Sequence, residues 1–180
     1  RFIILAIGYV NTMKKGIFPC SLLVFISLAI GCSAPSTENN SGHDQTSKVE
    51  NDLPDMRIRR LDQSEVDIKT LSGKVVLIFF FPECDHCQRE ASQISQNIAA
   101  FDNVTLYFIT SDTAEKAEGF AKDYFLSGLD NVVFGNTSAE GVLKNFGPIA
   151  TPSMYIYSAE QKLVKAFNGE VSISEVLKYI

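Results

Sequence analysis

The sequence predicts an α/β fold in which helices cover both faces of a mixed central β-sheet that begins with an N-terminal β-hairpin. Residues 75–81 are seven consecutive apolar residues, a pattern typical of a strand buried on both faces. Strand and helix patterns then alternate along the chain, and this order requires parallel strands joined by crossover helices. A second hairpin pattern near the C-terminus adds antiparallel strands, so the predicted sheet is mixed.

The N-terminal part of this fold begins with a hairpin. Residues 56–61 and 66–69 alternate between apolar and polar side chains, as half-buried strands do. A turn at residues 71–74 leads into the buried strand at residues 75–81. Helix-forming residues then dominate residues 85–101, with apolar side chains spaced for one helix face.

The C-terminal part continues the alternation. Ser111, Asp112 or Thr113 can cap the start of a helix, and Gly147-Pro148 ends a later one. The remaining expected elements are a strand at 104–109, a helix at 113–125, a strand at 132–134, a helix at 138–146, strands at 154–157 and 162–167, and a last helix at 172–180.

The first part of the chain has the pattern of an export signal. Met13 is followed by two lysines and then by an uncharged, largely apolar stretch, so we expect residues 13–31 to be a signal peptide. This stretch is shorter than the about 20 residues that a membrane-spanning helix needs. Because the chain opens with arginine, we expect residues 1–12 to be upstream sequence that is not translated.

The signal ends in LAIGC at residues 28–32, which resembles the lipobox of bacterial lipoproteins, although alanine lies three positions before Cys32. We therefore expect Cys32 to carry lipid that holds the protein on a membrane. A plain cleaved signal peptide and an uncleaved anchor are the alternatives. Residues 32–52 are mainly polar and are predicted to form a flexible tether, which is followed by one domain at residues 53–180.

The positions of the four cysteines limit their roles. Cys20 lies within the signal and Cys32 at its end, so Cys84 and Cys87 are the only free thiols expected in the exported protein. A disulfide between them can persist in an oxidising compartment. It closes a very small loop, however, and therefore constrains the unfolded chain little. A purely structural crosslink is a poor explanation of this pair.

Haem and metal sites are also poor explanations. A c-type haem site needs histidine directly after the second cysteine, and Gln88 stands there. Structural zinc needs four ligands, and the exported part offers only His43 and His86 beside the two thiols. A copper carrier of similar design would want a further histidine after His86. We expect no cofactor and no metal, and the scattered basic residues and net charge of −5 argue against nucleic acid as a partner.

Cys84 falls where the buried strand ends and the long helix begins. Unpaired N–H groups and the helix dipole at that point stabilise a thiolate. We therefore expect Cys84 to be the attacking thiol, with a lowered pKa, and Cys87 to be the less exposed resolving thiol. Protonated His86 would stabilise the thiolate further, whereas the carboxylates of Glu83 and Asp85 would oppose it. Alternatively, His86 is only an exposed polar residue at the start of the helix.

Several segments resemble the exported, membrane-tethered, thioredoxin-like oxidoreductases of the TlpA/ResA type, which have redoxin-like domains. LSGKVVL at residues 71–77 resembles the segment that leads into their first central strand. CDHCQRE at residues 84–90 resembles their CxxCxxE pattern, and ATPSMYIY at residues 150–157 resembles the segment that carries their cis-proline. The resemblance covers about residues 53–180, including Gly169, and implies a thioredoxin-like fold.

The resemblance also implies roles for residues outside the dithiol. Thr151 and a cis bond at Pro152 would lie against the cysteines, pair with the substrate backbone and keep metal ions from the thiols; an ordinary trans proline is the alternative. Glu90 would assist proton transfer at the second cysteine, unless it is a surface carboxylate. The chain departs from its relatives at Glu83, where many have tryptophan, and at Ile78, where thioredoxins have a buried acid.

These features predict a thiol–disulfide oxidoreductase in the bacterial cell envelope, with its domain facing the periplasm or the outside. We expect a monomer that exchanges disulfides with protein partners and receives electrons from an upstream electron-transfer protein. A thiol peroxidase is one alternative, but Phe81 occupies the position, three residues before Cys84, where that chemistry uses threonine. A lipoprotein that uses the fold only for binding is the other.

Overall fold

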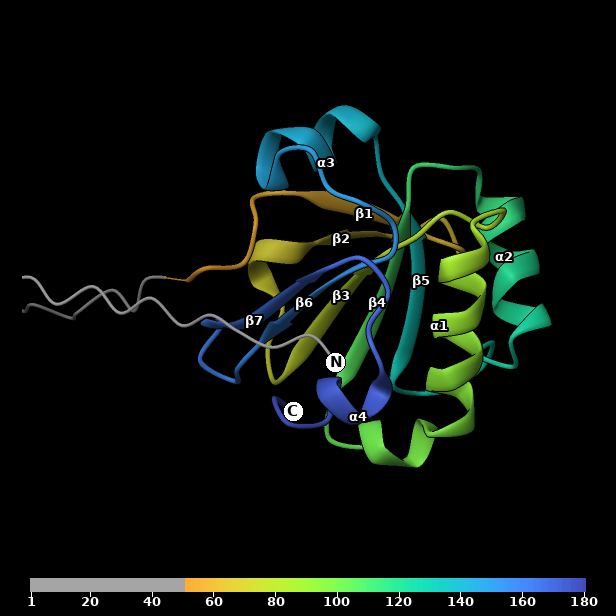
Figure 1. Cartoon of the computed structure of the whole chain (residues 1–180). Helices are drawn as coiled ribbons and strands as arrows, with labels where there is room; N and C mark the ends of the chain where they lie inside the picture. Colours follow the sequence, from red (N-terminus) through yellow and green to blue (C-terminus); the bar gives the residue numbers. More distant parts are fainter. Residues whose placement is uncertain (1–50) are drawn as a thin grey trace, which may run out of the picture. The chain divides into compact units, whose positions relative to one another are not determined.

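Figure 1 shows the computed structural model of the chain, which describes residues 51–180. The predictions for residues 1–12, residues 13–31 and Cys32, and most of the predicted tether, lie outside the described residues. Within them, the secondary structure follows the predicted order of elements. The strands are β1 (Arg57–Arg60), β2 (Glu65–Asp67), β3 (Val75–Phe79), β4 (Thr105–Thr110), β5 (Val132–Asn136), β6 (Ser153–Tyr157) and β7 (Leu163–Asn168). The helices are α1 (Asp85–Gln96), α2 (Ala114–Asp123), α3 (Ala139–Phe146) and α4 (Ile173–Val176), with 3₁₀ helices at Ile68–Thr70 and Ile98–Phe101.

The seven strands form one sheet in the order β2-β1-β5-β4-β3-β6-β7. β3, β4 and β5 are parallel, because α1 and α2 connect them as crossovers. β6 pairs antiparallel with β3, and β7 with β6, while β1 and β2 extend the opposite edge as an antiparallel hairpin. The predicted mixed sheet and N-terminal hairpin are therefore confirmed.

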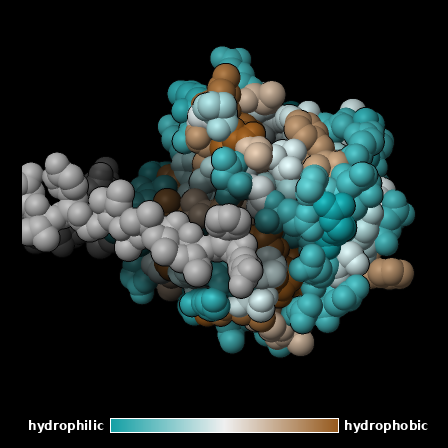
Figure 2. All heavy atoms as spheres, in the orientation of Figure 1, coloured by the Kyte–Doolittle hydropathy of each residue, from teal (hydrophilic) through white to brown (hydrophobic). Residues whose placement is uncertain are grey.

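Helices cover both faces of this sheet (Figure 1). The side chains of β3, all buried, alternate between the two layers. Val76 and Ile78 join the core formed with α1, α2 and α4, whereas Leu77 belongs to the core on the other face. There Phe146 of α3 packs against Phe79, with ring centroids 4.7 Å apart. The outer surface over α1 and α2 is mainly hydrophilic, as expected for amphipathic helices (Figure 2).

The helix that follows the dithiol is shorter than the predicted range of 85–101. α1 ends at Gln96, and a 3₁₀ helix continues the chain and buries Phe101 in the core. The buried residues of α1 recur with the helical period that places them on one face: Cys87, Glu90, Ala91 and Ile94. One stripe of α1 therefore carries both core packing and two ionisable groups.

The last helix is also shorter than the predicted range of 172–180. α4 ends at Val176, and beyond it Tyr179 packs against Phe167, with ring centroids 5.8 Å apart. Within the part of the chain that the structure describes, no helix has the length and apolar character needed to cross a membrane.

The first described residues are tied to the domain. The side-chain amide of Asn51 donates to the carbonyl of Lys69 at 2.8 Å, and the Asp52 carboxylate accepts from the backbone N–H of Leu163 at 3.0 Å. The backbone N–H of Asp52 donates to the carbonyl of Gln161 at 2.9 Å. Asn51 and Asp52, which the sequence placed in the tether, thus make hydrogen bonds as part of the fold.

Candidate active site

Cys84 lies between the end of β3 and the start of α1, where it is the N-cap residue. Its backbone N–H donates to the carbonyl of Phe81 at 3.1 Å, and its carbonyl accepts from the N–H of Gln88 at 3.0 Å. The side-chain amide of Gln88 also donates to the carbonyl of Pro82 at 2.9 Å. These bonds close the turn between strand and helix, so the backbone of Cys84 is held on both sides.

The two thiols are both free, but their environments differ. Cys84 is partly exposed, whereas Cys87 is 2% exposed. Burial tends to raise the pKa of Cys84, but hydrogen bonds from the Cys87 thiol and from the backbone N–H groups of Cys87 and His86 outweigh it, so the net pKa is lowered. Burial raises the pKa of Cys87 to about 12. Cys84 is therefore the thiol that ionises first and is the better nucleophile near neutral pH.

The loop before β6 lies against Cys84. Ser153, the first residue of β6, is paired with Phe79 at the end of β3, so this loop reaches the same end of the sheet. The Thr151–Pro152 peptide bond is cis. The Cys84 thiol donates to the carbonyl of Thr151 at 3.5 Å, across 67 residues of sequence. The fold therefore brings together the two segments that the sequence singled out.

Glu90 lies on the core-facing side of α1, one turn after Cys87. It is 2% exposed, and neither carboxyl oxygen has a hydrogen-bond partner among the described residues. Burial raises the pKa of Glu90 to about 7. The charge of Glu170 raises the pKa of Glu90 further. The nearby backbone N–H of Val171 partly lowers this pKa. The alternative of a surface carboxylate is wrong.

We expect the substitution Glu90→Gln to remove a pH dependence from the stability of the fold. A carboxyl group whose pKa rises on folding contributes stability that is fully present below its unfolded pKa and lost as the pH rises through the folded value, here about 7. Between about pH 4 and about pH 8 the loss amounts to roughly 3 kcal/mol. Urea unfolding of the reduced wild-type and E90Q proteins gives the free energy of unfolding at both pH values. The wild-type protein should lose stability between them, and E90Q should not. Parallel pH profiles for the two proteins would contradict a buried, neutral acid.

The imidazole of His86 points to a partner other than Cys84. Its Nδ1 lies 2.6 Å from Oε2 of Glu170, and the guanidinium of Arg89 donates to both oxygens of that carboxylate at 3.1 and 2.7 Å. Hydrogen bonds from Arg89 and His86 lower the pKa of Glu170 to about 2. It is the backbone N–H of His86 that stabilises the Cys84 thiolate. Sequence reasoning missed Glu170, because it lies 84 residues from His86.

Glu83, which was expected to oppose ionisation of Cys84, has a cationic partner. Its Oε1 lies 2.7 Å from Nζ of Lys116 in α2, and the same Nζ lies 3.0 Å from Oδ2 of Asp112. Both Glu83 and Lys116 are exposed, so the pair adds little stability. It nevertheless offsets the negative charge next to Cys84. The sequence carried no signal for this pair, since Lys116 reaches the site from a different helix.

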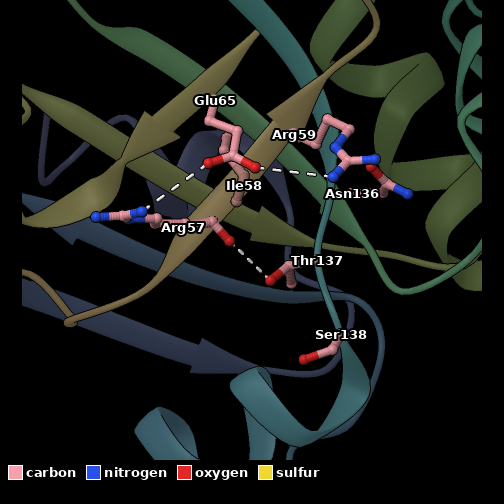
Figure 3. Close-up of a pocket in the computed structure, with 7 residues that line it drawn as sticks. All are labelled: Arg57, Ile58, Arg59, Glu65, Asn136, Thr137 and Ser138. Atoms are coloured by element: carbon pink, nitrogen blue, oxygen red, sulfur yellow. Dashed lines mark hydrogen bonds and ion pairs between the residues drawn. The ribbon is translucent and has the colours of Figure 1, made fainter. Parts of the chain in front are cut away.

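A hollow of about 270 Å³ lies outside the dithiol site, between β1 and the start of α3 (Figure 3). Arg57 and Arg59 both face the carboxylate of Glu65, at 3.9 and 3.7 Å. The Thr137 hydroxyl donates to the carbonyl of Arg57 at 2.8 Å. The opposite charges in this hollow already face one another, and no thiol lines it. Within residues 51–180, no three His, Cys, Asp or Glu side chains gather in a way that could hold a metal ion.

A mixed sheet with a dithiol at a strand–helix junction, faced by a cis-proline loop, is typical of a thioredoxin-like protein. A family model described as the AhpC/TSA family matches residues 49–166, and the chain belongs to this family. No curated protein is significantly similar to the chain in sequence.

Solved structures share the fold. A secreted disulfide oxidoreductase of Mycobacterium tuberculosis, homologous to Escherichia coli DsbE, is 22% identical with a TM-score of 0.59, over 69% of this chain and 93% of that one. StoA from Bacillus subtilis is 17% identical with a TM-score of 0.54, over 68% and 93%. Copper-bound ScoI from Arabidopsis thaliana is 18% identical with a TM-score of 0.55, over 68% and 91%. The thioredoxin-like fold predicted from the sequence is therefore confirmed.

Proposed function

We propose that this protein is a thiol–disulfide oxidoreductase that exchanges the Cys84–Cys87 dithiol or disulfide with protein partners in the cell envelope. The observation that carries the proposal is the contrast between the two thiols. Cys84 is accessible and has a lowered pKa, whereas Cys87 is buried with a pKa of about 12. Such a difference in exposure and pKa is needed when one thiol attacks the partner and the other resolves the mixed disulfide.

The exchange follows from the geometry of the pair. The Cys84 thiolate attacks one sulfur of a partner disulfide, so that the partner S–S bond breaks, a mixed disulfide forms and the released sulfur takes up a proton. Cys87 then loses its proton and attacks the Cys84 sulfur, which frees the second partner thiol. The partner gains two electrons and two protons, and the pair becomes a disulfide. A dithiol of an upstream electron-transfer protein restores it by the reverse steps.

Glu90 and the Thr151–Pro152 loop support these steps. The Glu90 carboxyl lies near enough to Cys87 for their charges to interact, so it can take the proton that Cys87 must lose. The Thr151 carbonyl already accepts a hydrogen bond from Cys84. The same loop can pair with the backbone of a bound protein segment in extended form.

The proposal includes export and lipid attachment at Cys32, with the domain on the periplasmic or outer side. The lipobox-like LAIGC segment supports it, as does the description of a structural neighbour as secreted. A mass spectrum of the mature N-terminus tests the acylation. We propose that the protein acts as a monomer.

The substitution Cys87→Ala should trap partners on Cys84, because the mixed disulfide then has no resolving thiol. Non-reducing gels of acid-quenched cells that express the full chain should show adducts that disappear on reduction and are absent from the C84A/C87A double variant. Mass spectrometry of the adducts identifies the partner proteins. Without such adducts, and with insulin left unreduced by the wild-type protein, exchange is excluded and a binding role is favoured. Consumption of peroxide at the expense of Cys84 would instead favour the peroxidase alternative.

A further inference from the structure

Glu170 ties the first turn of α1 to the loop after β7. It follows Gly169, whose backbone N–H donates to the carbonyl of Pro152 at 2.9 Å, so this loop is itself fixed against the cis-proline loop. From that fixed position the Glu170 carboxylate binds the guanidinium of Arg89 at both oxygens and lies 2.6 Å from Nδ1 of His86. Glu170 is the least exposed of the three side chains, at 24%. Two segments more than 80 residues apart are thus joined at the dithiol.

Glu170 holds the His86 imidazole both directly and through Arg89. Nη2 of Arg89, which Glu170 binds, also lies 2.7 Å from Nδ1 of His86. The hydrogen bonds to the Cys84 sulfur come from the Cys87 thiol and the backbone N–H groups of Cys87 and His86, with Thr151 on the opposite side. The imidazole is not among them, although its residue is only two positions from Cys84. Without Glu170, the ring would lose the carboxylate and Arg89 would lose its anchor, so the ring could turn toward the sulfur. A protonated imidazole beside a thiolate stabilises the thiolate and therefore the reduced form of a dithiol.

We propose that Glu170 is a positioning residue that sets the thiol–disulfide equilibrium of the Cys84–Cys87 pair by holding the imidazole of His86 away from the Cys84 sulfur. The proposal deepens, and rests on, the proposed exchange function. With Glu170 in place, the pair is a stronger reductant than a dithiol with histidine between its cysteines would otherwise be. The direction of exchange then depends on a residue far from the CxxC motif in sequence.

Other charged groups also face the dithiol. Glu83, paired with Lys116, and Asp85 flank Cys84 in the chain, while the charge of Arg89 interacts with Cys84 and that of the buried Glu90 with Cys87. Loss of the Glu170 charge would by itself favour the Cys84 thiolate, because a negative group is removed nearby. An experiment must therefore separate simple charge removal from release of His86.

The test compares Glu170→Ala, His86→Ala and the double variant in the full chain with Cys20 and Cys32 replaced by alanine. Each protein is equilibrated with glutathione, in the reaction that converts the disulfide and two reduced glutathione molecules into the dithiol and one glutathione disulfide. Thiolate absorbance is titrated in parallel. Below about pH 9 this titration reports Cys84, because the pKa of Cys87 is about 12. The expected result for E170A is an equilibrium shifted about threefold to tenfold toward the dithiol, with a lowered Cys84 pKa.

The other two variants decide the cause. H86A alone should move the equilibrium less than twofold, and H86A combined with E170A should return it close to the wild-type value. A shift that persists in the double variant would mean charge removal and would overturn the proposal. So would a full-sized shift in H86A alone, because the imidazole would then already act on Cys84.

Glu175→Ala is the matched control. It removes an exposed carboxylate of α4 that pairs with Lys178 rather than with the dithiol helix, and it should leave the equilibrium unchanged. Neither readout requires a protein partner. A failed search for partners would therefore count against the proposed exchange function but not against the role of Glu170. Thermal unfolding of each variant checks that the fold is intact.

Discussion

The substitution Cys84→Ser should abolish the reduction of disulfides by this protein, with a rate lowered roughly 10³-fold or more. A serine hydroxyl stays protonated at neutral pH, whereas Cys84 is the one thiol of the pair that can ionise there. The nucleophile is therefore lost, while the buried Cys87 cannot replace it. The measurement is the initial rate at which the reduced protein reduces insulin or an aromatic disulfide, in single turnover.

Cys87→Ser is the control for this experiment. It removes one thiol from the same helical turn but leaves Cys84 free to attack, so a first burst of mixed disulfide should remain. If C84S retained a rate within tenfold of the wild-type protein, the assignment of Cys84 as the attacking thiol would be wrong.

The substitution Phe80→Ala should lower the free energy of unfolding by about 4 kcal/mol. Phe80 is 2% exposed and lies in the chain between β3 and the dithiol. Its ring contacts three others, with centroid distances of 4.6 Å to Phe120 and 5.9 Å to both Phe108 and Phe134. Alanine leaves a cavity among rings that belong to separate elements and cannot easily close around it.

Phe81→Ala provides a neighbouring control of the same chemistry. Phe81 is 42% exposed, so its loss should change stability by less than about 1 kcal/mol. Urea unfolding of the reduced proteins at one pH gives both values, provided that fluorescence and circular dichroism report the same transition. A loss below about 1.5 kcal/mol for F80A would show that the aromatic cluster repacks.

The dithiol was predictable because its signals are local. The apolar run that becomes β3 and the helix pattern that becomes α1 place Cys84 at their junction without any knowledge of tertiary contacts. Thr113, one of the three cap candidates, caps α2 for the same local reason. The Thr151-Pro152 segment was found only through its resemblance to a known family, since its approach to Cys84 depends on the pairing of β6 with β3.

The charged surroundings of the dithiol were not predictable in the same way. Lys116 and Glu170 reach the site from other elements, and only the folded topology makes them neighbours of Glu83 and His86. The sequence contains no charge pattern that predicts pairs between residues so far apart. The ends of α1 and α4 were misjudged because tertiary packing, rather than helix propensity, decides where the final turns stop.

The hydrogen bonds of Asp52 fix the point at which the described chain joins the sheet. Asp52 is bound at the turn after β6, next to the end of β3 where Val75 pairs with Tyr157. Cys84 follows the other end of β3, beyond Phe79. The described chain therefore enters the domain at the end of the sheet opposite to the reactive sulfur. A probe joined to Asn51 would mark the end of β3 that is farthest from Cys84.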